Sequence, residues 1–153
     1  MNNSDIKILL VDDEPDILEI VGYNLKNEGY KVYTSTNGIE AVKSAKKIMP
    51  DLILLDIMMP EMDGIEACEK IRTIKNLENT LIAFLTARNE DYSKVAGFDA
   101  GADDYITKPI KPKVLVSKVK SLLRRLKAKN ETDANVIVGN ITINRDEYVI
   151  FKG

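Results

Sequence analysis

Short runs of consecutive apolar residues alternate along this chain with longer segments in which apolar residues recur every three or four positions. The runs at 6–11, 52–55 and 81–85 are almost wholly apolar, which is typical of parallel strands covered by helices on both faces. Two shorter runs, at 32–35 and 105–106, complete the predicted strands. This alternation predicts an α/β fold with a five-stranded, doubly wound parallel sheet.

The segments between and after these runs have the apolar spacing of helices. Pro15 suits the first turn of the first helix, and Asn37 is a favoured residue for capping the second. Gly29 closes the first helix. The predicted helices cover residues 17–25, 41–48, 65–72, 92–100 and 115–126.

The pattern changes after residue 126. Residues 127–135 are polar and have no apolar period, so they are predicted to form a linker. Beyond them, β-like runs at 136–138, 141–143 and 148–151 are separated by turn-forming residues. Such short strands bury little core alone, so we expect them either to pack on the first domain or to begin a second one. The predicted division is a domain at 1–126, a linker at 127–135 and the start of another domain at 136–153.

Composition excludes several kinds of chemistry. The chain has no histidine, which excludes histidine-based catalysis, the usual zinc sites and self-phosphorylation on histidine. Cys68 is the only cysteine, so no intrachain disulfide forms, and this fits a reducing compartment. No apolar run approaches the ~18 residues of a membrane-spanning helix, and the first residues do not resemble a signal peptide. We therefore expect a cytoplasmic protein without membrane contact.

Charged side chains follow the predicted strands at the points where the strands end. Asp12 and Asp13 follow the first strand, Asp56 follows the third, and Lys108 follows the fifth. The carboxyl ends of parallel strands lie along one sheet edge, so these residues are expected to meet. Crowded carboxylates stay ionised only beside a cation, and Mg²⁺ prefers oxygen ligands. The sequence thus predicts a Mg²⁺ site.

One of these carboxylates is placed to act as a nucleophile that forms an aspartyl phosphate. Asp56 is the best candidate, because Asp12 and Asp13 are adjacent and cannot both face inward along a strand. Lys108 would neutralise phosphoryl oxygens and Thr86 would donate a hydrogen bond to them. Each residue alone also has a plain structural explanation as a helix cap or a solvated charge. Their joint placement at strand ends favours the chemical interpretation.

In this order, the residues resemble the receiver domain of two-component response regulators over about residues 5–126. The resemblance implies a flavodoxin-like sheet of order 2-1-3-4-5 and a phosphoryl group taken by Asp56 from the phosphohistidine of a sensor histidine kinase. Such a domain is not an enzyme on other substrates and catalyses only its own phosphorylation and slow dephosphorylation. The motifs that carry the resemblance are Val11-Asp12-Asp13-Glu14-Pro15, Leu55-Asp56-Ile57-Met58-Met59-Pro60 with Asp63-Gly64, Leu85-Thr86-Ala87, and Gly101-Ala102-Asp103-Asp104-Tyr105-Ile106-Thr107-Lys108-Pro109.

The resemblance also assigns roles to single residues. Asp12, Asp13, Asp56 and the backbone carbonyl of Met58 would hold Mg²⁺. The bond before Pro109 would be cis. Thr86 and Tyr105 would form a switch, in which the hydroxyl moves toward the phosphoryl group and the ring turns inward. Without the family, Tyr105 would be interpreted as an ordinary half-buried aromatic of a strand.

The motif at 101–109, the Arg124-Arg125 pair and the β-like tail are similar to the OmpR/PhoB-like subfamily of winged-helix transcription factors. The tail resembles the opening sheet of their DNA-binding domain, and the recognition helix is expected to lie beyond this chain. DNA binding would therefore belong to a longer protein. Members dimerise when phosphorylated, through positions that correspond here to Lys94, Asp99, Asp103 and Arg124. This chain departs from them at Val114 and Lys118, usually glutamate and arginine.

Two other functions compete with this interpretation. A Mg²⁺-dependent phosphatase of the haloacid-dehalogenase-like class would carry a second aspartate two positions after the nucleophile, where this chain has Met58. A stand-alone receiver that acts only by docking to a protein would have no use for the β-like tail from Val136. Both alternatives stay open, and a phosphoacceptor that regulates transcription is favoured.

Overall fold

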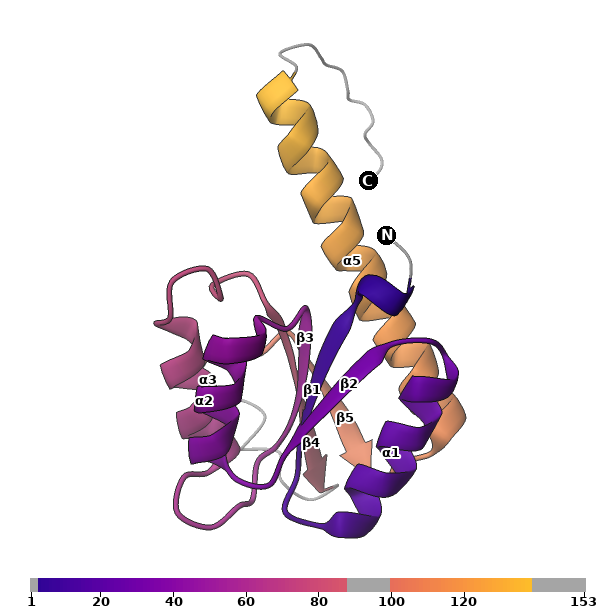
Figure 1. Cartoon of the computed structure of the whole chain (residues 1–153), viewed down its shortest axis with the longest axis vertical. Helices are drawn as coiled ribbons and strands as arrows, with labels where there is room; N and C mark the ends of the chain where they lie inside the picture. The colour runs from indigo at the N-terminus through magenta and orange to yellow at the C-terminus, as the bar shows by residue number, and fades with distance from the viewer. Residues whose placement is uncertain (1–2, 88–99, 139–153) are drawn as a thin grey trace. The chain divides into compact units, whose positions relative to one another are not determined.

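The computed structural model describes residues 3–87 and 100–138, with side chains described up to residue 126 (Figure 1). It divides into two units, Met1–Val119 and Lys120–Gly153. The predicted helix at 92–100 falls almost wholly outside the described residues, as do Lys94 and Asp99. No helix within 3–87 and 100–138 is long and apolar enough to cross a membrane.

A parallel five-stranded sheet of order β2-β1-β3-β4-β5 forms the centre of the first unit, which confirms the predicted fold. Each strand lies where an apolar run predicts one, although β4 and β5 extend beyond their runs. The strands are β1 (Lys7–Val11), β2 (Lys31–Ser35), β3 (Leu52–Asp56), β4 (Leu81–Ala87) and β5 (Asp104–Lys108).

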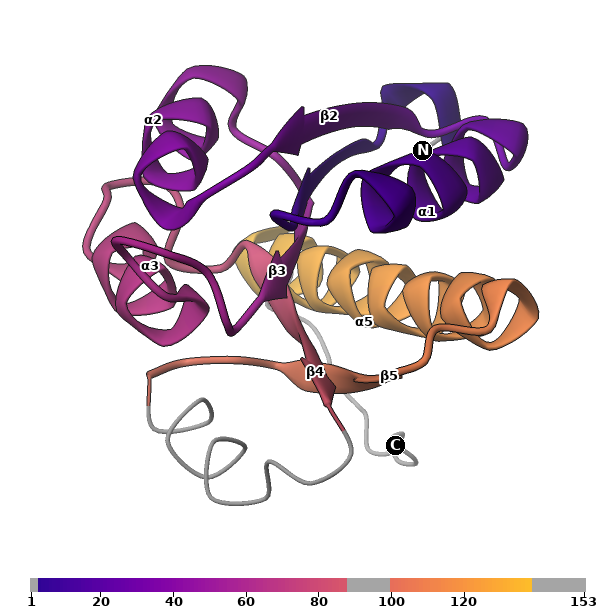
Figure 2. The same ribbon diagram turned by 90° about the horizontal axis from the view of Figure 1, so that it is seen from below.

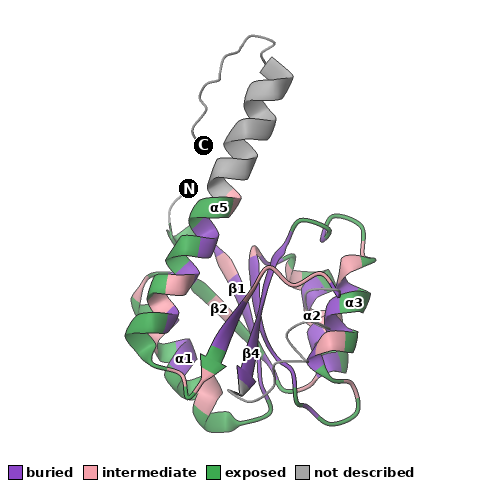
Figure 3. Cartoon of the chain, turned by 180° about the vertical axis from the view of Figure 1, so that it is seen from behind, coloured by how far each residue is buried: buried purple, intermediate pink, exposed green. Residues whose placement is uncertain are grey.

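Helices cover both faces of this sheet. The helices α2 (Gly38–Ile48) and α3 (Gly64–Arg72) lie side by side over one face, and α1 (Pro15–Asn27) lies over the other (Figures 1 and 2). A short 3-10 helix, Asn3–Asp5, precedes β1. The alternation of side chains along β1 explains why both faces need a cover: Leu9 and Val11 join the core under α2 and α3, while Ile8 and Leu10 are buried on the other face. Figure 3 shows mainly buried residues along the central strands, whereas the edge strand β2 is largely exposed.

The first residues of α2 and α3 are held by side-chain caps. Asn37 accepts a hydrogen bond from the backbone N–H of Glu40 at 2.8 Å, which confirms the predicted cap of α2. Asp63 accepts one in the same way from the N–H of Glu66, also at 2.8 Å. Both caps satisfy amide groups that have no partner within the helix. The caps therefore fix where α2 and α3 begin.

Arg72, at the end of α3, binds the segment that leads into β5. Its guanidinium donates to the carbonyl of Gly101 and to Asp103, with 2.9 Å between Nη2 and Asp103 Oδ2. It also donates to the carbonyl of Thr80 just before β4. Gly101 has a φ of 105°, and a Cβ there would lie 3.0 Å from Arg72 Nε. These contacts tie the beginnings of β4 and β5 to α3.

The last helix, α5 (Pro112–Val138), is longer than predicted. The segment 127–135, predicted as a linker without an apolar period, is helical. The run 136–138 is helical rather than a strand. Lysine, alanine and glutamate are good helix formers, so this segment continues a helix although it lacks an apolar stripe. The boundary between the two units falls inside this helix, after Val119. The runs at 141–143 and 148–151 lie outside the described residues, and the division at 126 and 135 stays a prediction.

Candidate metal centre

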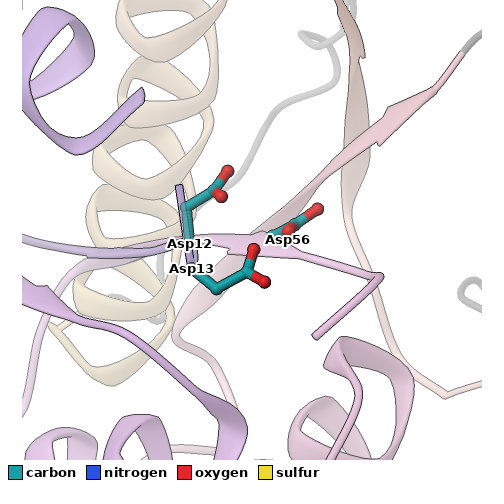
Figure 4. Close-up of side chains that lie close together, drawn as sticks. All are labelled: Asp12, Asp13 and Asp56. Atoms are coloured by element: carbon teal, nitrogen blue, oxygen red, sulfur yellow. The ribbon is translucent and has the colours of Figure 1, made fainter. Parts of the chain in front are cut away.

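The carboxyl ends of β1 and β3 bring the predicted acidic residues together. Val11 is in register with Leu55, so Asp12, just after β1, and Asp56, the last residue of β3, lie at the same level on neighbouring strands. Oxygen atoms of Asp12, Asp13 and Asp56 all lie within 4.8 Å of one another (Figure 4). Asp12 is fully buried and Asp56 is 4% exposed, while Asp13 faces solvent. The predicted cluster is therefore present, and it opens to solvent on one side.

Lys108, at the end of β5, joins this cluster through its ammonium group. The Nζ atom lies 3.2 Å from Asp12 Oδ2, 3.1 Å from Glu14 Oε2 and 3.3 Å from Asp56 Oδ1. Sequence reasoning placed Lys108 here but gave no role to Glu14. The only sign in the sequence that Glu14 belongs to this site is its position directly after Asp12 and Asp13.

Burial sets the electrostatics of the site. It raises the pKa of Asp56 to about 7, and repulsion from Asp12 adds to this effect while Lys108 opposes it. Burial also raises the pKa of Asp12, against a hydrogen bond from the N–H of Glu14 and the charge of Lys108. For Lys108, burial alone would lower the pKa, but attraction to Asp56 and Asp12 outweighs it and the pKa rises. The positive charge of Lys108 is therefore too small to balance the negative charges of the clustered carboxylates.

The donor set fits a hard divalent cation such as Mg²⁺. All three clustered groups are carboxylates, which are preferred Mg²⁺ ligands. Within the described part of the chain, Asp12 Oδ2 is the one buried side-chain oxygen or nitrogen atom without a hydrogen bond, although the Lys108 ammonium lies within ion-pair distance. A cation beside this oxygen would compensate for its burial. Asp12, Asp13 and Asp56 would hold the ion, and the role of the Met58 carbonyl stays a prediction.

The residues of the predicted switch lie on β4 and β5. Thr86 is 1% exposed and is in register with Thr107 on β5. It directly follows Leu85, which is in register with Asp56 on β3. Tyr105 is buried, and its ring centroid lies 5.6 Å from that of Phe84 at a tilt of 43°. The peptide bond between Lys108 and Pro109 is cis, as predicted. The movement of Thr86 and Tyr105 stays a prediction.

The residues expected at a dimer interface are only partly described. Asp103 Oδ2 accepts hydrogen bonds from Arg72 and from the N–H of Ile82, both at 2.9 Å, so this oxygen is engaged within the chain. Arg124 is exposed in the second unit. Lys118 lies 3.3 Å from Asp104 Oδ1 and donates to the carbonyl of Tyr105 at 3.1 Å. The interface role of these positions stays a prediction.

Gly64 allows α3 to begin against the backbone of Asp56. A Cβ at residue 64 would lie 2.9 Å from the carbonyl carbon of Asp56 and still nearer to its oxygen. Because these neighbours are backbone atoms, Gly64→Ala is expected to displace the loop after Asp56 and to reduce the free energy of unfolding by about 1 to 3 kcal/mol. Urea denaturation measures this loss. Gly22→Ala is the control, since a Cβ there meets nothing within 4 Å; equal stability of both variants would contradict the expectation.

Comparison with known proteins gives consistent matches. The family described as response regulator receiver domain matches residues 8–120. The alkaline phosphatase synthesis transcriptional regulatory protein PhoP of Bacillus subtilis (strain 168) is 41% identical over 150 residues, 93% of this chain and 62% of its own length. This chain thus spans less than two thirds of that relative.

Solved structures with the same fold include a putative response regulator from Chloroflexus aurantiacus J-10-fl. It is 35% identical with a TM-score of 0.74, and the match covers 78% of this chain and 98% of that one. The chemotaxis response regulator CheY4 of Vibrio cholerae is 33% identical with a TM-score of 0.73, over 76% of this chain and 97% of its own. The family match spans the sheet and the acidic cluster alike, so this chain belongs to the response regulator receiver domains.

Proposed function

We propose that Asp56 accepts a phosphoryl group from the phosphohistidine of a sensor histidine kinase. The family itself implies a two-component, phosphoryl-accepting function. The observation that carries the assignment to Asp56 is its geometry: a nearly buried carboxylate within 4.8 Å of two others and 3.3 Å from a lysine ammonium. Asp12 lies deeper and is fully buried, and Asp13 is exposed to solvent.

The proposed transfer needs little from the protein beyond position and charge. A carboxylate oxygen of Asp56 forms a bond to phosphorus while the bond between phosphorus and the partner's imidazole nitrogen breaks, and that nitrogen keeps the electron pair. Lys108 places a positive charge beside the phosphoryl oxygens. Thr86 would donate its hydroxyl to one of them. A bound Mg²⁺ would supply the remaining charge neutralisation at Asp12, Asp13 and Asp56.

A receiver of this kind is not a classical enzyme. We further propose that the Asp56 phosphate hydrolyses slowly, because the position two residues on is Met58 and offers no base. The Met58 side chain is 66% exposed. This favours a signalling role over a phosphatase that turns over small phosphate esters.

The output of this receiver is proposed to be transcriptional. The PhoP relative is named a transcriptional regulatory protein, and it extends beyond the region matched here. We propose that phosphorylation shifts Thr86 and Tyr105, promotes a homodimer and so controls DNA binding by a longer protein. The proposed interface includes Lys94, Asp99, Asp103 and Arg124. The cytoplasmic location stays a prediction of the sequence.

Intact mass spectrometry tests the proposed function directly. The chain is incubated with acetyl phosphate and MgCl₂, and the mass is recorded over time. We expect the mass to increase by one phosphoryl group and to return slowly after the donor is removed. Labelling is expected to fail when EDTA replaces MgCl₂. An unchanged mass with MgCl₂ present would overturn the proposal, and continuous hydrolysis of p-nitrophenyl phosphate would favour the phosphatase instead.

A further inference from the structure

Lys108 is surrounded by more carboxylates than phosphoryl transfer requires. Its ammonium has three N–H groups. It donates to Glu14 Oε2 at 3.1 Å and to Asp56 Oδ1 at 3.3 Å, and lies 3.2 Å from Asp12 Oδ2. These three carboxylate oxygens crowd the ammonium group at 3.1 to 3.3 Å. A phosphoryl group on Asp56 would therefore compete with these carboxylates for the lysine.

Glu14 is the partner that is released most easily. Its side chain is 59% exposed, whereas those of Asp12 and Asp56 are 0% and 5% exposed. An exposed carboxylate regains water when its ion pair breaks, but a buried one does not. Glu14 can therefore turn into solvent at a small cost in free energy.

The backbone around Glu14 holds it in place for this contact. Glu14 is the N-cap of α1, yet its side chain makes no capping hydrogen bond. Its backbone N–H donates to Asp12 Oδ1 at 2.9 Å, which fixes the residue beside the acidic cluster. The carboxylate reaches instead across to Lys108, which lies 94 residues later in the chain. The side chain is thus committed to the lysine and not to its own helix.

We propose that Glu14 is a positioning residue, which holds Lys108 while Asp56 is unphosphorylated and releases it to the phosphoryl group. This inference rests on the proposed function of Asp56. Glu14 stabilises only the state before transfer, so it acts as a modest brake on phosphorylation. It makes no contact with Lys108 after transfer, and so it does not affect the hydrolysis of the aspartyl phosphate.

The test compares Glu14→Gln with the unchanged chain at saturating MgCl₂. We expect labelling by acetyl phosphate to be about two- to fivefold faster, the range expected for an exposed ion pair, and dephosphorylation to be unchanged. A change in folding would not separate the two rates in this way. Unphosphorylated Glu14→Gln is also expected to bind Mg²⁺ about two- to fivefold more weakly by calorimetry, because Lys108 then pairs only with Asp12 and Asp56.

Two variants separate the contact from the charge. Asp16→Asn removes an exposed carboxylate in the first turn of the same helix and is expected to leave both rates and the Mg²⁺ affinity unchanged. Glu14→Asp keeps the charge on a shorter side chain that does not reach Lys108, so it should label as fast as Glu14→Gln. Unaltered labelling by Glu14→Gln, or Glu14→Asp behaving as the unchanged chain, would overturn the inference. Failure of the unchanged chain to label at all would instead overturn the proposed function.

Discussion

Replacing Asp56 with asparagine is expected to abolish labelling by acetyl phosphate in the presence of Mg²⁺. The amide has nearly the same shape but lacks the nucleophilic carboxylate, and the neighbouring Asp12 is fully buried. Loss of a nucleophile commonly lowers a rate by several orders of magnitude, so the rate should fall by at least about a thousandfold. Intact mass over time measures it, and peptide mapping of the labelled chain should place the phosphoryl group on residue 56.

Asp63→Asn is a matched control for this experiment. Asp63 lies on the loop that follows Asp56 and caps α3, and asparagine caps a helix about as well as aspartate does. The substitution therefore removes one negative charge near the site but keeps the helix boundary, and labelling should stay within about twofold of the unchanged chain. If Asp56→Asn labels at the normal rate, another carboxylate is the acceptor, and mapping to Asp12 or Asp13 would identify it.

The fold and most of the site could be predicted because both depend on backbone topology. Strands buried on both faces must be apolar throughout, as at 52–55, so they are conspicuous in the sequence. Parallel pairing then brings their carboxyl ends to one edge, and Asp12, Asp56 and Lys108 meet there whatever the details of the loops. The cluster is thus a consequence of strand order rather than of any local motif.

Features that depend on the contacts of single side chains, or on a helix propensity that is only slightly favourable, could not be predicted. The contact of Glu14 with Lys108 joins positions 94 residues apart through a flexible, exposed side chain. Apart from the ion pair with Asp103, the contacts of Arg72 are made with backbone carbonyls, which leave no trace in sequence composition. The continuation of α5 through 127–138 has no apolar stripe to indicate it. Polar residues with good helix propensity allow either a helix or an irregular segment, and here they form a helix.

Without Mg²⁺, the protein is expected to become less stable as the pH rises from about 5 to about 8. The chain has no histidine, so no side chain of ordinary pKa titrates in this interval. Asp56 does, because its pKa is raised from 3.8 to about 7 in the folded state. The folded protein binds a proton that the unfolded chain has already released. The stability that this proton provides is complete below about pH 4 and is lost as the pH rises through 7, with an upper value of about 4 kcal/mol.

Urea denaturation in EDTA at several pH values measures this effect, and two further arms identify its source. Asp56→Asn removes the titrating group, so it should be more stable than the unchanged chain at about pH 8 and should lose most of the pH dependence. Added Mg²⁺ binds the ionised carboxylates of the folded state and should restore stability to the unchanged chain at that pH but much less to Asp56→Asn. The same slope with pH in both proteins would place the titrating group elsewhere. If Mg²⁺ did not stabilise the unchanged chain, Asp12, Asp13 and Asp56 would not form a Mg²⁺ site.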